Sequence, residues 1–151
     1  MNNKLISLIF LFVIFVLFLL SCRSAHGPWV DLTEPDTLGG ISSFNKDTVK
    51  RAGDLLQVSV RTVYYGESRD YISRLFGKKY ENFAYVINLE EINCAKKEYQ
   101  ILSTTLYDTR HQVLHTQTYA KENWEKISSG SDVDELTRLL CKRKAGRNHR
   151  P

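Results

Sequence analysis

The chain has 151 residues, 42% of them hydrophobic and 25% charged, with a formal net charge of +4 at pH 7. This length suits one domain with one hydrophobic core, even without an N-terminal leader of about 20 residues. The charge is uneven, because residues 23–141 hold 15 Lys and Arg against 17 Asp and Glu, and residues 142–150 add five bases and no acid. A body that is not basic argues against a nucleic-acid-binding domain.

The chain begins with an apolar segment behind one positive charge. Lys4 precedes a run of apolar or small residues at positions 5–20. This layout is typical of a secretory signal peptide. Positions 19–22, Leu-Leu-Ser-Cys, resemble the bacterial lipobox, in which the cysteine sulfur receives a diacylglyceryl group. We therefore expect a lipoprotein signal peptide over residues 1–21 and a lipid such as palmitate on Cys22. An uncleaved N-terminal anchor in the inner membrane is the alternative.

Residues 22–28 are expected to tether the lipid to the domain. A mature lipoprotein carries two or three acyl chains, and more than one chain is needed for stable anchoring. Arg23 stands where an Asp would indicate inner-membrane retention in enteric bacteria. The expected location is therefore the outer membrane, with the domain on its periplasmic face or on the cell surface.

The middle of the chain has the patterns of strands. In chain order we expect strands at residues 29–32, 47–51, 56–64, 82–92, 97–107 and 112–119. The clearest is 56–64, where apolar residues alternate with polar ones, as in an antiparallel sheet with one buried face. Residues 82–92 show a similar alternation, with Glu90-Glu91 interpreted as a charged strand end. Residues 69–76 predict a short helix that ends at Gly77.

The C-terminal part changes to a helical period. Ser131 is a typical N-cap, and acidic residues in the following turn favour the helix dipole. Apolar residues then recur at positions 133, 136 and 140, and Cys141 lies on or next to this stripe. The predicted fold class is α+β: an antiparallel β-sheet with a C-terminal α-helix packed on one face.

Three cysteines are an odd number for an exported protein. Lipidation of Cys22 leaves one pair, Cys94 and Cys141, in an oxidising compartment. A disulfide between them would stabilise the fold by about 4 kcal/mol in the chain-entropy estimate. Two free buried thiols are the alternative.

No arrangement of residues in the sequence predicts catalysis. His111 and His115 are four apart, which along a strand separates them by roughly 13 Å, too far to share one ion. The acidic run 132–135 lacks the glycine and spacing of a calcium loop. Neither a nucleophile elbow nor a phosphate-binding loop occurs. We expect no enzyme, no cofactor and no metal site.

A series of short motifs in the second half of the chain appears in a fixed order: Asn93-Cys94, 99–103, Tyr107-Asp108, 124–127, 129–131 and 139–142. The series resembles the surface-adhesin protein E family of Gram-negative bacteria, over about residues 29–143 and most specifically over 93–142. The resemblance implies an antiparallel sheet, a C-terminal helix fastened by Cys94–Cys141, and a lipid-anchored place in the envelope. Asn93, His111 and Ser129 depart from the Asp, Gly and Pro usual in the family.

The expected organisation is then a domain at residues 29–143 followed by a basic, disordered tail at 144–151. The chain contains eight tyrosines, a residue enriched at interfaces. The candidate binding face consists of Tyr64, Tyr65, Tyr80 and Tyr107. We expect a lipid-anchored binding protein of the envelope, an adhesin for host or matrix proteins, whose partner is a protein or a second copy of the chain. The alternative is a periplasm-facing structural or assembly lipoprotein.

Overall fold

The computed structural model describes residues 27–34 and 38–142. This part of the chain forms an antiparallel sheet of seven strands and two α-helices, which confirms the α+β prediction. The strands are β1 (Trp29–Asp31), β2 (Ile41–Ala52), β3 (Leu55–Val63), β4 (Phe83–Asn93), β5 (Glu98–Asp108), β6 (Val113–Thr118) and β7 (Glu125–Lys126). The helices are α2 (Gly66–Phe76) and α3 (Asp132–Leu140), with a short 3-10 helix, η1 (Lys78–Tyr80).

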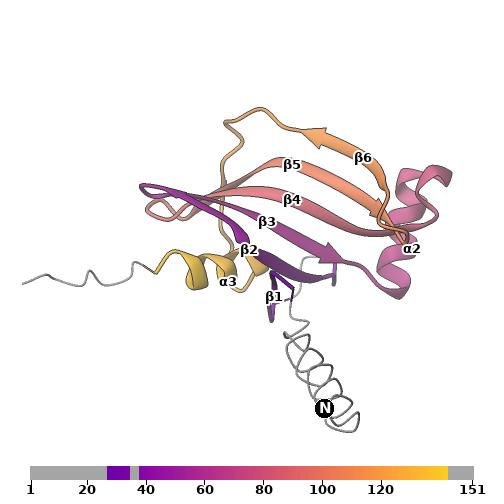
Figure 1. Ribbon diagram of the computed structural model, residues 1–151, viewed down its shortest axis with the longest axis horizontal. Coiled ribbons are helices and arrows are strands. Elements are labelled where there is room, and N and C mark those ends of the chain that lie inside the picture. Colours follow the sequence, from indigo (N-terminus) through magenta and orange to yellow (C-terminus); the bar gives the residue numbers. More distant parts are fainter. Residues whose placement is uncertain (1–26, 35–37, 143–151) are drawn as a thin grey trace, which may run out of the picture.

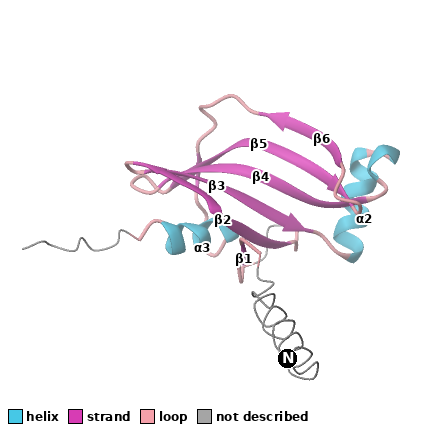
Figure 2. Cartoon of the chain, viewed as in Figure 1, coloured by secondary structure: helices cyan, strands magenta, loops and turns pink. Residues whose placement is uncertain are grey.

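Strands β1 to β6 lie side by side in chain order, and β7 pairs with the beginning of β5 (Figure 1). α2 joins β3 to β4 at one end of the sheet. α3 lies near the opposite end, against β2 and β3 (Figure 2). The arrangement leaves a separate group of apolar residues beneath each helix.

The main core lies between α3 and one face of the sheet. In β3 every second residue is buried, and Leu56, Val58 and Val60 are at most 2% exposed. Leu136 of α3 is fully buried against this face. Successive side chains of a strand point to opposite faces. The apolar residues that alternate in the sequence of β3 are therefore the ones that enter the core.

α3 begins and ends as the sequence predicts. The Ser131 hydroxyl accepts a hydrogen bond from the backbone N–H of Asp134 at 3.1 Å, which satisfies one of the free donors of the first turn. Glu135 accepts hydrogen bonds from the backbone N–H groups of Thr33 and Glu34 and from the Thr33 hydroxyl. These bonds, the one from Glu34 first, lower the pKa of Glu135. They also attach the segment after β1 to α3.

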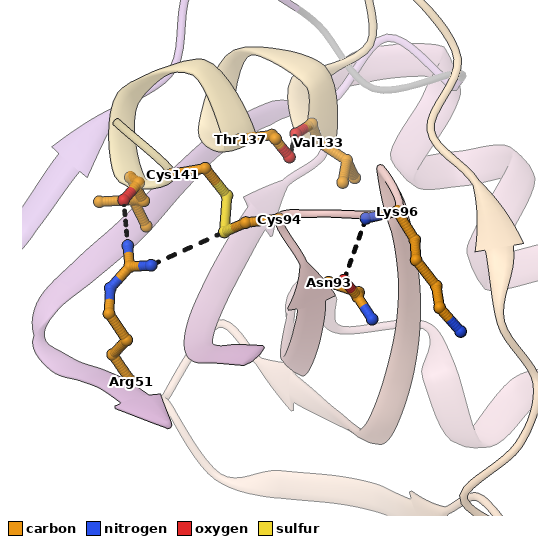
Figure 3. The surroundings of a disulfide bond; sticks show 8 residues. Arg51, Asn93, Cys94, Lys96, Val133, Thr137 and Cys141 are labelled. Carbon is orange, nitrogen blue, oxygen red and sulfur yellow. Dashed lines mark hydrogen bonds between the residues drawn. A yellow bond between two sulfur atoms is a disulfide. The ribbon is translucent and has the colours of Figure 1, made fainter. Parts of the chain in front are cut away.

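A disulfide joins Cys94, which follows β4, to Cys141 at the C-terminal end of α3 (Figure 3). The two Cα atoms are 5.5 Å apart, although the residues are separated by 47 positions. Arg51 of β2 donates hydrogen bonds to the carbonyl of Leu140 and to the Cys94 sulfur. The disulfide predicted from the cysteine count thus fastens α3 to the sheet.

β2 is longer than predicted, because the sequence indicated only its second half. Its first half contains Ser42 and Ser43, which are polar and yet at most 2% exposed. Ser42 hydrogen-bonds to Thr62 on β3 and donates to Asp132 at the start of α3. A bulge between Asn45 and Lys50 separates the two halves. Buried serines and a bulge give no apolar alternation, so this part of the strand had no signal.

β4 corrects two predictions. Ala84 is an extra residue in the pairing of β4 with β5, so the alternation predicted for residues 82–92 breaks between Phe83 and Tyr85. From Tyr85 to Asn93 the strand pairs with β3 without a shift. The interpretation of Glu90-Glu91 as a charged strand end was wrong, because the two side chains are only 4% and 7% exposed. Both residues lie inside the strand and pair with β3 and β5.

The signal peptide at residues 1–21, Cys22 and the basic tail at 144–151 lie outside the described residues. In the part of the chain that the structure describes, neither helix has the length and apolar character needed to span a bilayer.

Candidate protein-binding site

Several exposed apolar residues gather around α2. The helix begins after Tyr65, whose backbone is extended, and ends at Gly77, whose φ of 89° favours glycine. Its position at the end of the sheet follows from its role as the connection between β3 and β4. One residue of the helix, Ile72, is buried, and it packs with Phe83 and Leu106 of the sheet.

α2 carries more large apolar residues than this one contact can bury. Leu75, Phe76 and Tyr71 are 65%, 53% and 52% exposed. Tyr65, just before the helix, and Leu38, in the loop before β2, are 62% and 48% exposed. We call these five residues the α2 patch. Exposed apolar residues that gather in this way mark interaction sites more often than single ones do.

The α2 patch surrounds a cavity of about 230 Å³ between the helix and the sheet. Four patch residues, Leu38, Tyr71, Leu75 and Phe76, contribute to its walls. Phe83 and Leu106 of the sheet also line it. A largely apolar cavity of this size suits the side chain of a partner rather than a drug-sized ligand, which needs roughly 300 Å³ or more.

Three of the four tyrosines predicted to form a binding face lie at this end of the molecule. Tyr64 is half-buried, with its ring 5.9 Å from that of Phe83, and it lines the cavity. Tyr65 belongs to the α2 patch. The Tyr80 ring lies 5.4 Å from that of Phe76, and the Lys79 ammonium is 5.6 Å from the Tyr80 centroid.

Tyr107 lies elsewhere. It stacks on Tyr85 of β4, with ring centroids 4.8 Å apart. Tyr85 in turn pairs with Val63 of β3, whose side chain points away from the face that bears the buried Thr62. The Tyr85 hydroxyl lies 3.1 Å from Nδ1 of His111, and burial and then Tyr107 raise the pKa of Tyr85. The structure therefore does not bring all four tyrosines onto one surface.

The sequence did not identify Leu38, Leu75 and Phe76 as candidate residues. A signal was present in residues 71–76, where four of six residues are large and apolar. That is more than one buried stripe of a short helix holds. Leu38 had no local signal, because only the tertiary structure brings the loop before β2 next to α2.

The polar residues considered as ligands do not gather. His111 is exposed in the β5–β6 turn at a φ of 62°, in the left-handed region that favours glycine, and His115 is exposed in β6. Among the described residues no group of three or more His, Cys, Asp and Glu side chains is arranged to hold a metal ion.

Comparison with known proteins identifies the fold. Residues 29–142 match the family described as surface-adhesin protein E. The structure of Haemophilus influenzae protein E is similar, with a TM-score of 0.51 and 10% identity, over 78% of this chain and 86% of that one. Its selenomethionine form gives a TM-score of 0.51 and 9% identity, over 78% and 88%. At this identity the likeness concerns the fold alone. No curated protein matches the chain.

Proposed function

Because the chain belongs to the surface-adhesin protein E family, we propose that it is a lipid-anchored adhesin that binds a host protein through the α2 patch. The observation that carries this proposal is the group of five large apolar residues, each between 48% and 65% exposed, around an apolar cavity. The proposed partner is an extracellular protein that inserts an aliphatic or aromatic side chain into the cavity.

Burial favours this use of the α2 patch. Removing apolar surface from water contributes roughly 25 cal/mol per Å², and a few well-buried aromatic and aliphatic anchors usually dominate an interface. Phe76 and Leu75 are such anchors, since they are neighbours at the end of one helix and both border the cavity. Tyr65 adds a ring with a polar tip, a residue type that interfaces favour.

The anchor is the second part of the proposal. Lipidation of Cys22 would hold the chain on its membrane, and only six residues separate that cysteine from β1. An extended chain of this length spans roughly 20 Å, so the domain would stay close to the bilayer. The basic residues after position 141 would add attraction to acidic surfaces, an effect that weakens as ionic strength rises.

The test uses intact cells that carry the full chain. The variant Leu75→Ala/Phe76→Ala removes two anchors of the α2 patch, and Val113→Ala/Leu139→Ala removes two other exposed apolar side chains as a matched control. We expect the first variant to lower capture of immobilised host matrix proteins by on the order of tenfold. The control should capture like the wild type. The loss should persist at high salt, because apolar contacts are not screened.

Equal capture by the two double variants would contradict binding through the α2 patch. Protease added to intact cells addresses the location separately. A surface adhesin is digested, whereas a chain that faces the periplasm is protected and would have a structural or assembly role instead.

A further inference from the structure

A second cavity lies between the sheet and the N-terminal end of α3, beside β7. Its volume is about 260 Å³, and residues of β3, β4, β5, β7 and α3 line it. The lining is mostly polar and includes three carboxylates: Glu90, Glu125 and Asp132. We call it the acidic cavity. Tyr64 lines both this cavity and the one beside α2, so the two open on the same side of the sheet.

Glu90 is the residue that distinguishes the acidic cavity. Its side chain is 4% exposed, and its Oε2 has no hydrogen-bond partner among the described residues. The same carboxyl group receives a hydrogen bond from the side chain of Asn88. Buried polar atoms nearly always have a partner in native proteins. Oε2 of Glu90 has less than 1 Å² of exposed surface, so a donor must enter the cavity and the side chain must rotate slightly for the two to meet.

The residues around Glu90 do not neutralise it. Asp132 is another acid, and its two oxygens accept from the Ser42 hydroxyl and from a backbone N–H. Glu125 on β7 accepts from the Tyr99 hydroxyl at 3.3 Å. Lys126 also lines the cavity, but its ammonium lies 2.7 Å from Oε1 of Glu98. The cavity thus holds a surplus of negative charge.

We propose that the acidic cavity binds an alkylammonium group, with Oε2 of Glu90 as its main acceptor. The group would come from a lysine side chain of a partner protein or from a free aliphatic diamine. Hydroxyl oxygens in the lining, those of Thr62, Ser128 and Ser131, are further acceptors. Ile101 and Val133 line the cavity as well and would contact the alkyl chain.

An ammonium fits this lining better than other cations do. A metal ion is disfavoured, because the described residues contain no group of three or more ligating side chains. A guanidinium prefers a carboxylate with two free oxygens, and Glu90 offers only one. An ammonium has three donors that point in different directions and suits scattered acceptors. The volume, below the roughly 300 Å³ of ordinary ligand sites, suits a small group.

The proposed binding is coupled to a proton. Burial, and then Asp132, raise the pKa of Glu90 to about 8, so at pH 7 its carboxyl group is mostly protonated. An ammonium must displace that proton, and its own pKa is about 10.4. Apparent affinity should therefore increase up to about tenfold per pH unit until about pH 8, and then level off. Burial raises the pKa of Tyr99 to about 12, so Tyr99 stays neutral over this range.

Isothermal titration calorimetry of the full chain in non-ionic detergent tests the proposal, with n-butylammonium chloride as the probe. We expect saturable binding whose affinity rises between about pH 6 and 8. Titrations at about pH 7 in two buffers of different ionisation enthalpy should show that close to one proton is released per ligand. Cadaverine and an acetylated lysine amide separate the two sources, since tighter binding of cadaverine indicates a free diamine and tighter binding of the amide indicates a lysine side chain.

Three variants complete the test. Glu90→Gln should weaken binding at high pH by on the order of tenfold and abolish proton release. Glu91→Gln is the matched control, because Glu91 is an equally buried neighbour whose two oxygens accept from Gln57 and Gln100. Glu125→Gln, at an exposed position, should weaken binding about two- to threefold and leave proton release unchanged.

Failure of every amine to bind the wild type, or equal binding by Glu90→Gln and the wild type, would overturn the proposal. Circular dichroism shows whether the Gln variants are folded. The proton release is measured on the wild type, so this part of the test stands even if a variant does not fold. The α2 patch takes no part in this measurement, so its outcome is independent of the proposed adhesin function.

Discussion

At the scale of single residues, Glu90 and Glu91 show how position in a sheet decides the state of a carboxyl group. They are neighbours in β4, so their side chains point to opposite faces. Glu91 meets two amide donors, Gln57 at 2.8 Å and Gln100 at 2.7 Å. Glu90 is buried and lies near Asp132, and burial first and Asp132 second raise its pKa to about 8. The same residue type has both oxygens paired on one face and one oxygen unpaired on the other.

Glu90 should make the stability of the fold depend on pH. Its pKa is about 8 in the folded protein against an ordinary value of 4.5. The folded state therefore retains a proton that the unfolded state loses. The contribution of Glu90 to stability is fully present below the ordinary pKa and falls as pH rises towards 8, by at most about 1.4 kcal/mol per unit and by about 5 kcal/mol in total.

Glu90→Gln should remove this dependence. Urea unfolding at several pH values gives the free energy of unfolding of the variant and of the wild type. Their difference isolates the effect of Glu90, because the other carboxyl groups contribute equally to both proteins. The variant should be no more stable than the wild type at acid pH and more stable at mildly alkaline pH. Parallel curves for the two proteins would show that Glu90 is ionised in the folded state.

Gly40 provides a steric prediction at the same scale. A Cβ at this position would lie 2.5 Å from Cγ2 of Thr62 and 2.8 Å from Cε1 of Tyr64. Gly40→Ala should therefore destabilise the domain by about 1–3 kcal/mol, as overpacking does. Gly27→Ala is the control, because a Cβ there meets no atom within 4 Å. Thermal denaturation should separate the two variants, and equal melting temperatures would refute the close contact.

At the scale of elements, the two helices differ in how they are held. α3 is only nine residues long, yet it has a capping serine, a buried leucine, the contacts of Glu135 and a disulfide at its end. α2 has no side-chain hydrogen bond at its N-cap and one buried residue. The better-held helix builds the core, whereas the other carries the exposed apolar patch.

Removal of the disulfide should destabilise the fold through α3. Replacement of Cys94 and Cys141 by alanine, or reduction of the wild type, should lower the free energy of unfolding by about 2–5 kcal/mol. Urea denaturation with and without reductant measures the change. The reductant should leave the alanine variant unaffected, which is the control. Alkylation without reductant should modify neither thiol in the wild type, and modification of both would contradict the bond.

At the scale of the whole molecule, the sheet connects two candidate sites and a proposed anchor. The cavity beside the α2 patch and the acidic cavity open on the same side of the sheet, and Tyr64 lines both cavities. β1 begins at Trp29, close in the chain to Cys22. A lipid at that cysteine would therefore set the distance at which both sites are presented from the membrane.

Lipidation of Cys22 is the prediction at this scale. Cells fed an alkyne fatty acid should incorporate it into the wild type and not into Cys22→Ala, because the thioether forms on that sulfur. The variant should also leave the membrane fraction, since anchoring depends on the acyl chains. Label in both proteins would indicate another attachment site, and retention of the unlabelled variant would indicate an uncleaved anchor.

The sequence alone determined the features that depend on near neighbours. The alternation of β3, the Ser131 cap and the apolar stripe of α3 are all encoded within one strand or one turn. The Cys94–Cys141 bond followed from the cysteine count and the expected export. The family could also be identified from short motifs in order, and the comparison with known families confirms it.

Only the tertiary structure decided what depends on pairing between distant segments. The pairing of β4 with β3 decides which residues of β4 face α3, and a shift of one residue would move each side chain to the other face. The observed register sets Glu90 opposite Val58, whose side chain packs under α3, and so places Glu90 in the wall of a cavity. Leu38 joins Leu75 and Phe76 because the loop before β2 lies against α2. Both sites are assembled from residues far apart in the chain, and local periodicity carries no information about such contacts.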